Sequence, residues 1–147
     1  MIKKLLSIIV MFLCCAGVYA QYQSTLVGST KTTVTLRTVG YGKNAKAAVA
    51  DAEQKAVEML MYAGVQETPY RFPMIAENKD AAMAKNKSFF KDFEDGSFKS
   101  YIESSMIVVP FGKDSTKKKC ATVDVCVRAE QLRASLERAG IIRKFGF

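Results

Sequence analysis

Alternation of apolar and polar residues predicts three strands in this chain. Residues 32–39 (TTVTLRTV) are rich in β-branched side chains, which is typical of a strand. Residues 104–111 (SSMIVVPF) form a second apolar run, in which Pro110 indicates an edge or a bulge. Residues 119–128 alternate, with Ala121, Val123, Val125 and Val127 on one face and Cys120, Thr122, Asp124 and Cys126 on the other. The last two runs predict a β-hairpin with one buried face and one wetter face.

Two segments repeat apolar residues at intervals of three and four, which predicts amphipathic helices. The first covers residues 45–63, with Asn44 as its N-cap and Gly64 as its C-cap. Its apolar side is mostly alanine, and small side chains let a helix approach a sheet closely. We therefore expect this helix to lie flat on the strands. The second helix covers residues 129–139 and ends at Gly140.

The remaining segments are less regular. Residues 21–31 are polar and rich in Ser and Thr, which predicts a loose leader or a first edge segment. Residues 65–101 form an irregular insertion that contains a helical piece over residues 80–93. Residues 141–147 (IIRKFGF) predict a final short strand.

The order of these elements predicts a single α+β domain over residues 21–147. It corresponds to a split β-α-β-β-α arrangement, in which helices lie on one face of a mainly antiparallel sheet. If both helices lie on the same face, the opposite face is left to water or to a partner.

Residues 1–20 have the pattern of a secretory signal peptide. Two lysines precede an apolar run over residues 5–15, and Val-Tyr-Ala ends the segment at Ala20. The run is shorter than the roughly 20 residues of a membrane span. We expect cleavage after Ala20, a periplasmic or cell-surface location, and no transmembrane segment in the mature protein. No small residue precedes Cys14 or Cys15 as in a lipid-attachment site, so we expect no lipoprotein.

The basic excess permits contact with an anionic surface, or it serves only the solubility of the protein. Loss of residues 1–20 leaves 20 basic residues against 14 acidic ones, a net charge of +6. Four lysines crowd the predicted hairpin tip, namely Lys113, Lys117, Lys118 and Lys119. Such a cluster either contacts an anionic surface or discourages edge-to-edge pairing of strands. Export separates the protein from nucleic acid.

The two cysteines of the mature chain lie in one predicted strand. Six residues of strand separate the Cα atoms of Cys120 and Cys126 by about 20 Å, whereas a disulfide needs roughly 4.4–6.8 Å. They are therefore not expected to pair with each other. Half-buried free thiols and an intermolecular bridge both remain open.

The residues for common catalysis are missing. The chain has no His, which excludes Ser-His-Asp and Cys-His chemistry and removes the commonest metal ligand. Residues 40–45 fit the dinucleotide pattern G-x-G-x-x-A, but no strand follows at the spacing of a compact βαβ unit, so a tight turn is expected. Asp92, Glu94 and Asp95 lie in one polar run and face no cleft. We expect no enzyme, cofactor or metal.

Three segments of the chain resemble a known family. Residues 35–42 (TLRTVGYG), 45–60 (AKAAVADAEQKAVEML) and 120–127 (CATVDVCV) are similar to the amino-terminal domain of flagellar assembly protein T and related small Gram-negative envelope lipoproteins. The resemblance covers about residues 32–139 and is one of fold. It implies an exported β-α-β-β-α domain that serves assembly or adhesion rather than catalysis.

These observations predict an exported, non-catalytic envelope protein that acts as an interaction or assembly module. Its expected partner is another envelope protein, a second copy or an anionic surface. The candidate contact residues are Lys113, Lys117, Lys118, Lys119, Thr122, Asp124 and Cys126. The alternative is a periplasmic protein that binds a small ligand in a pocket between the sheet and the aromatic middle segment, lined by Phe89, Phe93 and Tyr101.

Overall fold

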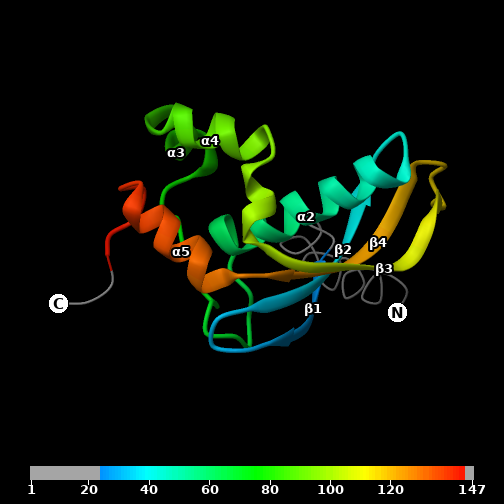
Figure 1. The fold of residues 1–147 in the computed structure, drawn as a ribbon, viewed down its shortest axis with the longest axis horizontal. Helices are drawn as coiled ribbons and strands as arrows, with labels where there is room; N and C mark the ends of the chain where they lie inside the picture. The colour runs from blue at the N-terminus through cyan, green and yellow to red at the C-terminus, as the bar shows by residue number, and fades with distance from the viewer. Residues whose placement is uncertain (1–23, 145–147) are drawn as a thin grey trace, which may run out of the picture.

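A computed structural model describes residues 24–144 of the chain (Figure 1). One sheet contains β1 (Ser24–Ser29), β2 (Val34–Tyr41), β3 (Ile102–Lys113) and β4 (Lys119–Val127). The strands lie in the order β1-β2-β4-β3, and each neighbouring pair is antiparallel. Strands β2 and β3 therefore run in the same direction with β4 between them. This arrangement confirms the predicted split β-α-β topology.

The helices complete the α+β fold that the sequence predicts. They are α2 (Ala45–Tyr62), α3 (Lys79–Lys85), α4 (Lys87–Glu94), the 3-10 helix η2 (Ser97–Tyr101) and α5 (Ala129–Arg138). Helix α2 crosses the sheet over β2 and β4, whereas α3 and α4 lie together near the end of the sheet where α5 follows β4 (Figure 1). No helix among residues 24–144 is long and apolar enough to cross a membrane.

Alanine lets α2 lie close to the sheet, as predicted. Ala48, Ala52 and Ala56 are fully buried between the helix and the strands. Gly40 of β2 lies directly beneath them, and a Cβ atom at this position would collide with the Ala48 carbonyl oxygen and lie 2.6 Å from the Ala52 nitrogen. Close contact between α2 and β2 therefore requires glycine at position 40. Asn44 caps the helix, since its Oδ1 accepts the Ala47 N–H at 2.8 Å.

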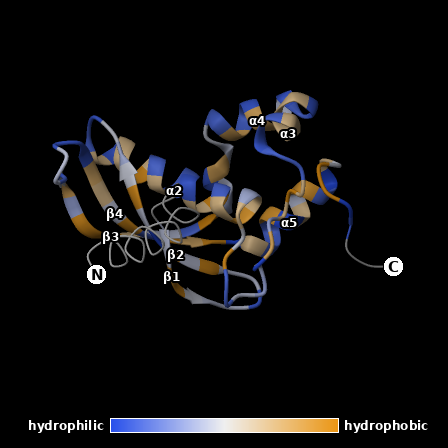
Figure 2. Ribbon diagram, turned by 180° about the vertical axis from the view of Figure 1, so that it is seen from behind, coloured by the Kyte–Doolittle hydropathy of each residue, from blue (hydrophilic) through white to orange (hydrophobic). Residues whose placement is uncertain are grey.

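The hydrophobic core lies between α2 and the facing side of the sheet. Alternate strand positions such as Leu36, Val123 and Val125 are fully buried, and the same alternation is visible along the strands in Figure 2. Five aromatic side chains of the middle segment join this core, and Phe89 packs against it in a partly buried position; the five are Tyr70, Phe90, Phe93, Phe98 and Tyr101. The middle segment is therefore an extension of the core.

Three segments can be compared with their predictions. Of the two alternatives for residues 21–31, the edge segment is correct, because Ser24–Ser29 forms β1. The helix predicted over residues 80–93 is two helices, because Asn86 leaves helical geometry (φ −128°, ψ 47°). Its side chain then donates to the carbonyl of Ala82 at 3.0 Å, which helps to end α3.

The final strand predicted over residues 141–147 is wrong for residues 141–144, which form no strand. The N–H of Ile141 donates to the Leu136 carbonyl at 3.0 Å, and both Ile141 and Ile142 pack against the core in partly buried positions. These apolar residues therefore cover the end of α5 instead of pairing with the sheet. The predicted signal peptide and residues 145–147 lie outside the described residues.

Candidate functional site

The sheet face opposite α2 holds three of the predicted contact residues. Cross-strand pairing places Thr122 beside Val39, Asp124 beside Arg37 and Cys126 beside Thr35, on the side away from the buried positions of β4. Thr122 and Cys126 are half-buried, whereas only 9% of Asp124 is exposed. The placement agrees with the alternation in the sequence. A role in partner contact stays a prediction.

Asp124 already has a partner within the fold. Nε of Arg37 donates to its Oδ1 at 2.8 Å and Nη2 donates to its Oδ2 at 3.0 Å. This two-point bond lowers the pKa of Asp124 below its ordinary value of 3.8 and raises that of Arg37. The pair ties β2 to β4 at the middle of the outer face. Arg37 was missing from the sequence-based candidates, although its position two residues before Val39 places it on this face.

Among residues 24–144, Cys120 and Cys126 are free and half-buried, which is one of the two interpretations that the sequence left open; the intermolecular bridge stays a prediction. Sγ of Cys126 donates to Oε2 of Glu103 at 3.3 Å. Cys120 lies opposite Tyr41 near the other end of β4. Six residues of strand separate the two thiols, so they occupy different parts of the outer face.

Strand β3 exposes a run of large apolar side chains at the edge of the sheet. The exposed fractions are 64% for Met106, 50% for Ile107 and 53% for Val109, and Val108 is exposed as well. No charged residue lies between Glu103 and Lys113. The register against β4 shifts at three places along the strand. Pro110 thus lies in an irregular edge strand, as its sequence context predicts.

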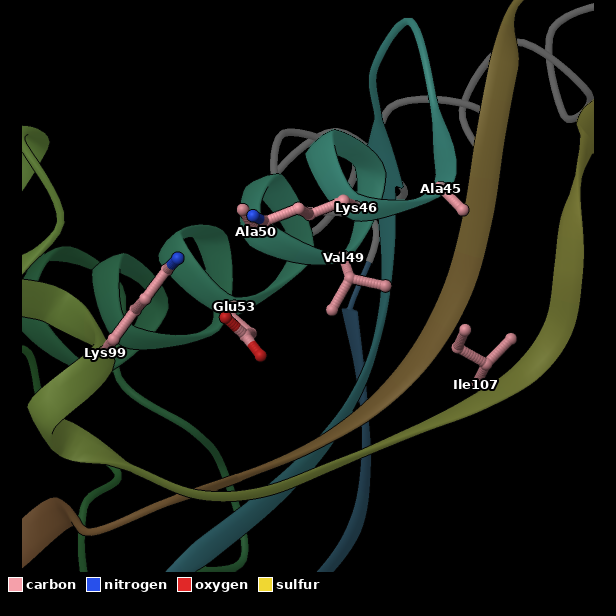
Figure 3. Close-up of a pocket in the computed structure, with 7 residues that line it drawn as sticks. All are labelled: Ala45, Lys46, Val49, Ala50, Glu53, Lys99 and Ile107. Atoms are coloured by element: carbon pink, nitrogen blue, oxygen red, sulfur yellow. The ribbon is translucent and has the colours of Figure 1, made fainter.

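A groove separates this strand from α2. It has a volume of about 400 Å³ and is lined by Ala45, Lys46, Val49, Ala50, Glu53, Lys99 and Ile107. Val49 points from the helix toward the strands and Ile107 points from β3 into the same space (Figure 3). Oγ of Ser105 donates to Oε1 of Glu53 at 2.7 Å. The sequence alone did not predict this groove, because residues from α2 and β3 form it only in the folded chain.

The predicted lysines gather at the β3–β4 turn, where Asp114 holds the backbone. Its Oδ1 accepts the Thr116 N–H at 2.8 Å, the Thr116 hydroxyl at 2.7 Å and the Lys118 N–H at 3.0 Å. The Thr116 hydroxyl bond is the main cause that lowers the pKa of Asp114 below 3.8. Lys113 and Lys119 lie directly opposite each other across the hairpin. The turn is therefore an ordered structure that presents positive charge.

Tyr41 connects this turn to the start of α2. Its hydroxyl donates to Oδ2 of Asp114 at 3.4 Å, and the ammonium groups of Lys55 and Lys118 lie 4.8 and 5.9 Å from its ring centroid. Its N–H donates to Oδ2 of Asp51 at 2.8 Å. The sequence-based candidates did not include Tyr41, and only its position at the end of β2, opposite Cys120, indicates this role.

Among residues 24–144, no three His, Cys, Asp or Glu side chains gather where they would hold a metal ion. The two surfaces with unusual chemistry are the apolar edge of β3 and the lysine-rich turn. Both are exposed.

A scan against protein-family models, a search of curated proteins and a search of solved structures each found no match. The resemblance to the flagellar assembly family therefore stays a prediction. The functional argument depends on the geometry of the described residues.

Proposed function

We propose that this protein is an exported, non-catalytic envelope protein that acts as an interaction or assembly module through the edge of β3. The observation that carries the proposal is the run of exposed apolar side chains from Met106 to Val109. Exposed apolar side chains along a sheet edge cost solubility unless another surface covers them.

The irregular edge strand β3 favours contact through its side chains and disfavours the unspecific addition of a strand from another molecule. Its register shifts, and the missing N–H of Pro110 interrupts a regular ladder of hydrogen bonds. Natural sheets use these devices to prevent aggregation. Glu103 and Lys113 add charge at the two ends of the apolar run. A partner must therefore match the shape and charges of this strand, which is what a specific contact needs.

The groove beside β3 provides a recess for a partner's side chain. Its walls at Val49, Ala50 and Ile107 are apolar, and the charged groups of Lys46 and Glu53 lie at the same groove. An apolar anchor inside a recess with polar groups around it is the usual arrangement of an interface centre. The exposed strand and the groove are continuous through Ile107.

Photo-crosslinking in intact cells tests this proposal. A photoreactive residue at Met106 or Val109 should give one discrete crosslinked species, whose mass separates a second copy from another envelope protein. Val27 of β1 is the matched control, because it is 49% exposed and lies on the opposite edge of the sheet. No discrete species from β3, or equal crosslinking from Val27, would contradict the proposal.

The alternative function is binding of a small ligand. A hollow of about 550 Å³ beside the middle segment is lined by Met74, Ile75 and Ile142, and not by the aromatic residues expected for it. Phe93 and Tyr101, two of the residues expected to line such a pocket, are buried among other core side chains. Phe93 packs on Phe98 with ring centroids 5.8 Å apart. We therefore advance contact through β3 alone.

A further inference from the structure

Five lysines from two separate segments meet at one end of the molecule. We call this region the lysine end and define it as Lys43, Lys113, Lys117, Lys118 and Lys119. The β2–α2 turn and the β3–β4 turn reach the same end of the molecule (Figure 1). The N–H of Gly42 donates to the Lys119 carbonyl at 3.2 Å, which joins the two turns.

The acidic residues close to the lysine end are already engaged. Asp114 accepts three hydrogen bonds within its own turn and a fourth from Tyr41. Asp51 accepts the Tyr41 N–H and pairs with Lys55 at 2.7 Å. None of the five lysines of the lysine end forms an ion pair within residues 24–144. Their charge is therefore available to a partner.

Three of these lysines work against the stability of the hairpin. Lys113 lies directly opposite Lys119, and like charges at facing positions of an antiparallel pair are destabilising. Lys117 has a φ of +64°, in the left-handed region where glycine or asparagine fits better. A chain selected for stability alone would place other residues here. Local choices that oppose the fold are expected where a surface serves function.

The chemistry of the cluster favours a fluid anionic surface over a fixed anion site. All five cations are lysines, which are flexible point charges, whereas arginine is preferred for fixed two-point recognition of carboxylate or phosphate. No deep cavity encloses them, since all five side chains are exposed. Apolar Val109 and Pro110 line a hollow together with Lys113 on the same part of the hairpin. Lysines next to small apolar groups match the interface of a bilayer.

From these observations we propose that the lysine end docks onto the surface of a bilayer that contains anionic phospholipid. Each lysine contributes by attraction to the negative surface and keeps its ammonium group in the headgroup region. Val109 borders both this surface and the β3 edge, so substitutions of the lysines alone test the bilayer contact separately from the proposed function.

Vesicle binding tests the inference with protein recovered from the exported fraction of the producing cells. Sedimentation is compared between vesicles of pure phosphatidylcholine and vesicles with equal parts of phosphatidylglycerol. Neutral vesicles measure any apolar insertion, so the difference between the two isolates the charge effect. We expect strong preference for the anionic vesicles and its loss in 1 M salt, where the screening length falls to about 3 Å.

A matched pair of triple variants locates the binding surface. Lys117→Gln, Lys118→Gln and Lys119→Gln together should weaken binding to anionic vesicles about 100-fold, since each lysine near the surface contributes about fivefold. Lys87→Gln, Lys91→Gln and Lys99→Gln change the net charge equally but lie on α4 and η2, and all three are exposed. This control should bind nearly as the wild type does.

The single change Lys119→Glu separates function from folding. It places an acidic residue opposite Lys113, so the hairpin should become more stable while binding to anionic vesicles falls. Loss of binding together with a raised melting temperature supports a dedicated surface. Equal weakening by the two triple variants, or no preference for anionic vesicles, would overturn the inference. Absence of a preference for anionic vesicles would instead favour an acidic protein as the partner of the lysine end.

Discussion

The face of the sheet under α2 and the lysine end at the hairpin follow opposite rules. Under α2, glycine, alanine and valine fill the space between helix and strands, and Gly40 occupies a position where no larger residue fits. At the lysine end, two lysines face each other across β3 and β4, and a third has a left-handed backbone conformation. The first region uses residues that stabilise the fold, and the second uses residues that destabilise it.

The difference indicates in which part of the molecule the needs of folding alone explain the choice of residues. A region in which every residue agrees with its local structure needs no further explanation. A region that combines like charges, backbone strain and an adjacent apolar edge needs a partner to explain its composition.

The largest effect is expected at Gly40. A Cβ atom there would press against the backbone of Ala48 and Ala52, so α2 would have to move away from β2. Gly40→Ala should lower the free energy of unfolding by about 3 kcal/mol, the upper part of the usual range for overpacking. Urea unfolding followed by circular dichroism measures this change.

Gly28 provides the control for the Gly40 prediction. It also lies in a strand, but no atom lies within 4 Å of a Cβ added there. Gly28→Ala should change the free energy of unfolding by no more than about 0.5 kcal/mol. Similar losses for the two substitutions would mean that α2 does not lie as close to β2 as described.

The next effect concerns the Arg37–Asp124 pair and depends on pH. Because Arg37 lowers the pKa of Asp124 below 3.8, ionised Asp124 stabilises the folded state above that value. The contribution is lost as the pH falls through the lowered pKa. Asp124→Asn should therefore reduce the urea midpoint at pH 7, and its difference from the wild type should shrink toward pH 2.

The partner substitution shows whether this pH dependence belongs to the pair. Arg37→Gln should reproduce the pattern, and the double variant should lose little more than either single one, because both changes remove the same bonds. Asp114, whose pKa is also lowered, keeps its own acid dependence in all three proteins. A difference between Asp124→Asn and the wild type that persists unchanged at pH 2 would refute the assignment.

The sequence predicted the features that depend on one element and missed those that depend on distant residues. Alternation in residues 119–128 correctly assigned the faces of β4, and alanine spacing correctly placed α2 against the sheet, because both patterns repeat along one element. Arg37, Tyr41 and the groove beside Ile107 were missed, since each depends on residues that are distant in sequence. Asp124 looked like a free contact residue for the same reason, as its partner lies 87 positions away.

The sequence pattern also mispredicted a short apolar segment, because such a segment can either pair as a strand or cover the end of a helix. Ile141 and Ile142 are typical of a strand, yet they pack beside the end of α5. These residues directly follow α5, and Gly140, with a positive φ of 73°, ends the helix before them. Tertiary contacts determine the structure of segments this short.

A small gain in stability is expected at the lysine end. Lys113→Glu replaces a repulsive pair with an attractive one opposite Lys119, which should add roughly 0.5 kcal/mol to the free energy of unfolding. The gain should fall in 1 M salt because both side chains are exposed. Lys87→Glu on α4 makes the same change of charge away from the hairpin and serves as the control. An equal gain in the control would show that net charge, and not the facing lysines, destabilises the protein.

The smallest effect on stability is expected at Met106, where the effect on contact should be greatest. Its side chain is 64% exposed, so Met106→Lys should leave the free energy of unfolding within about 0.5 kcal/mol of the wild type. A charge at the first position of the apolar run would nevertheless have to lose its water if a partner covered β3. Crosslinking from Val109 in the Met106→Lys background should therefore disappear, whereas Val27→Lys on β1 should leave it intact. A crosslink that survives Met106→Lys would mean that the apolar edge is only tolerated by the fold, and the contrast between the two regions would then depend on the lysines alone.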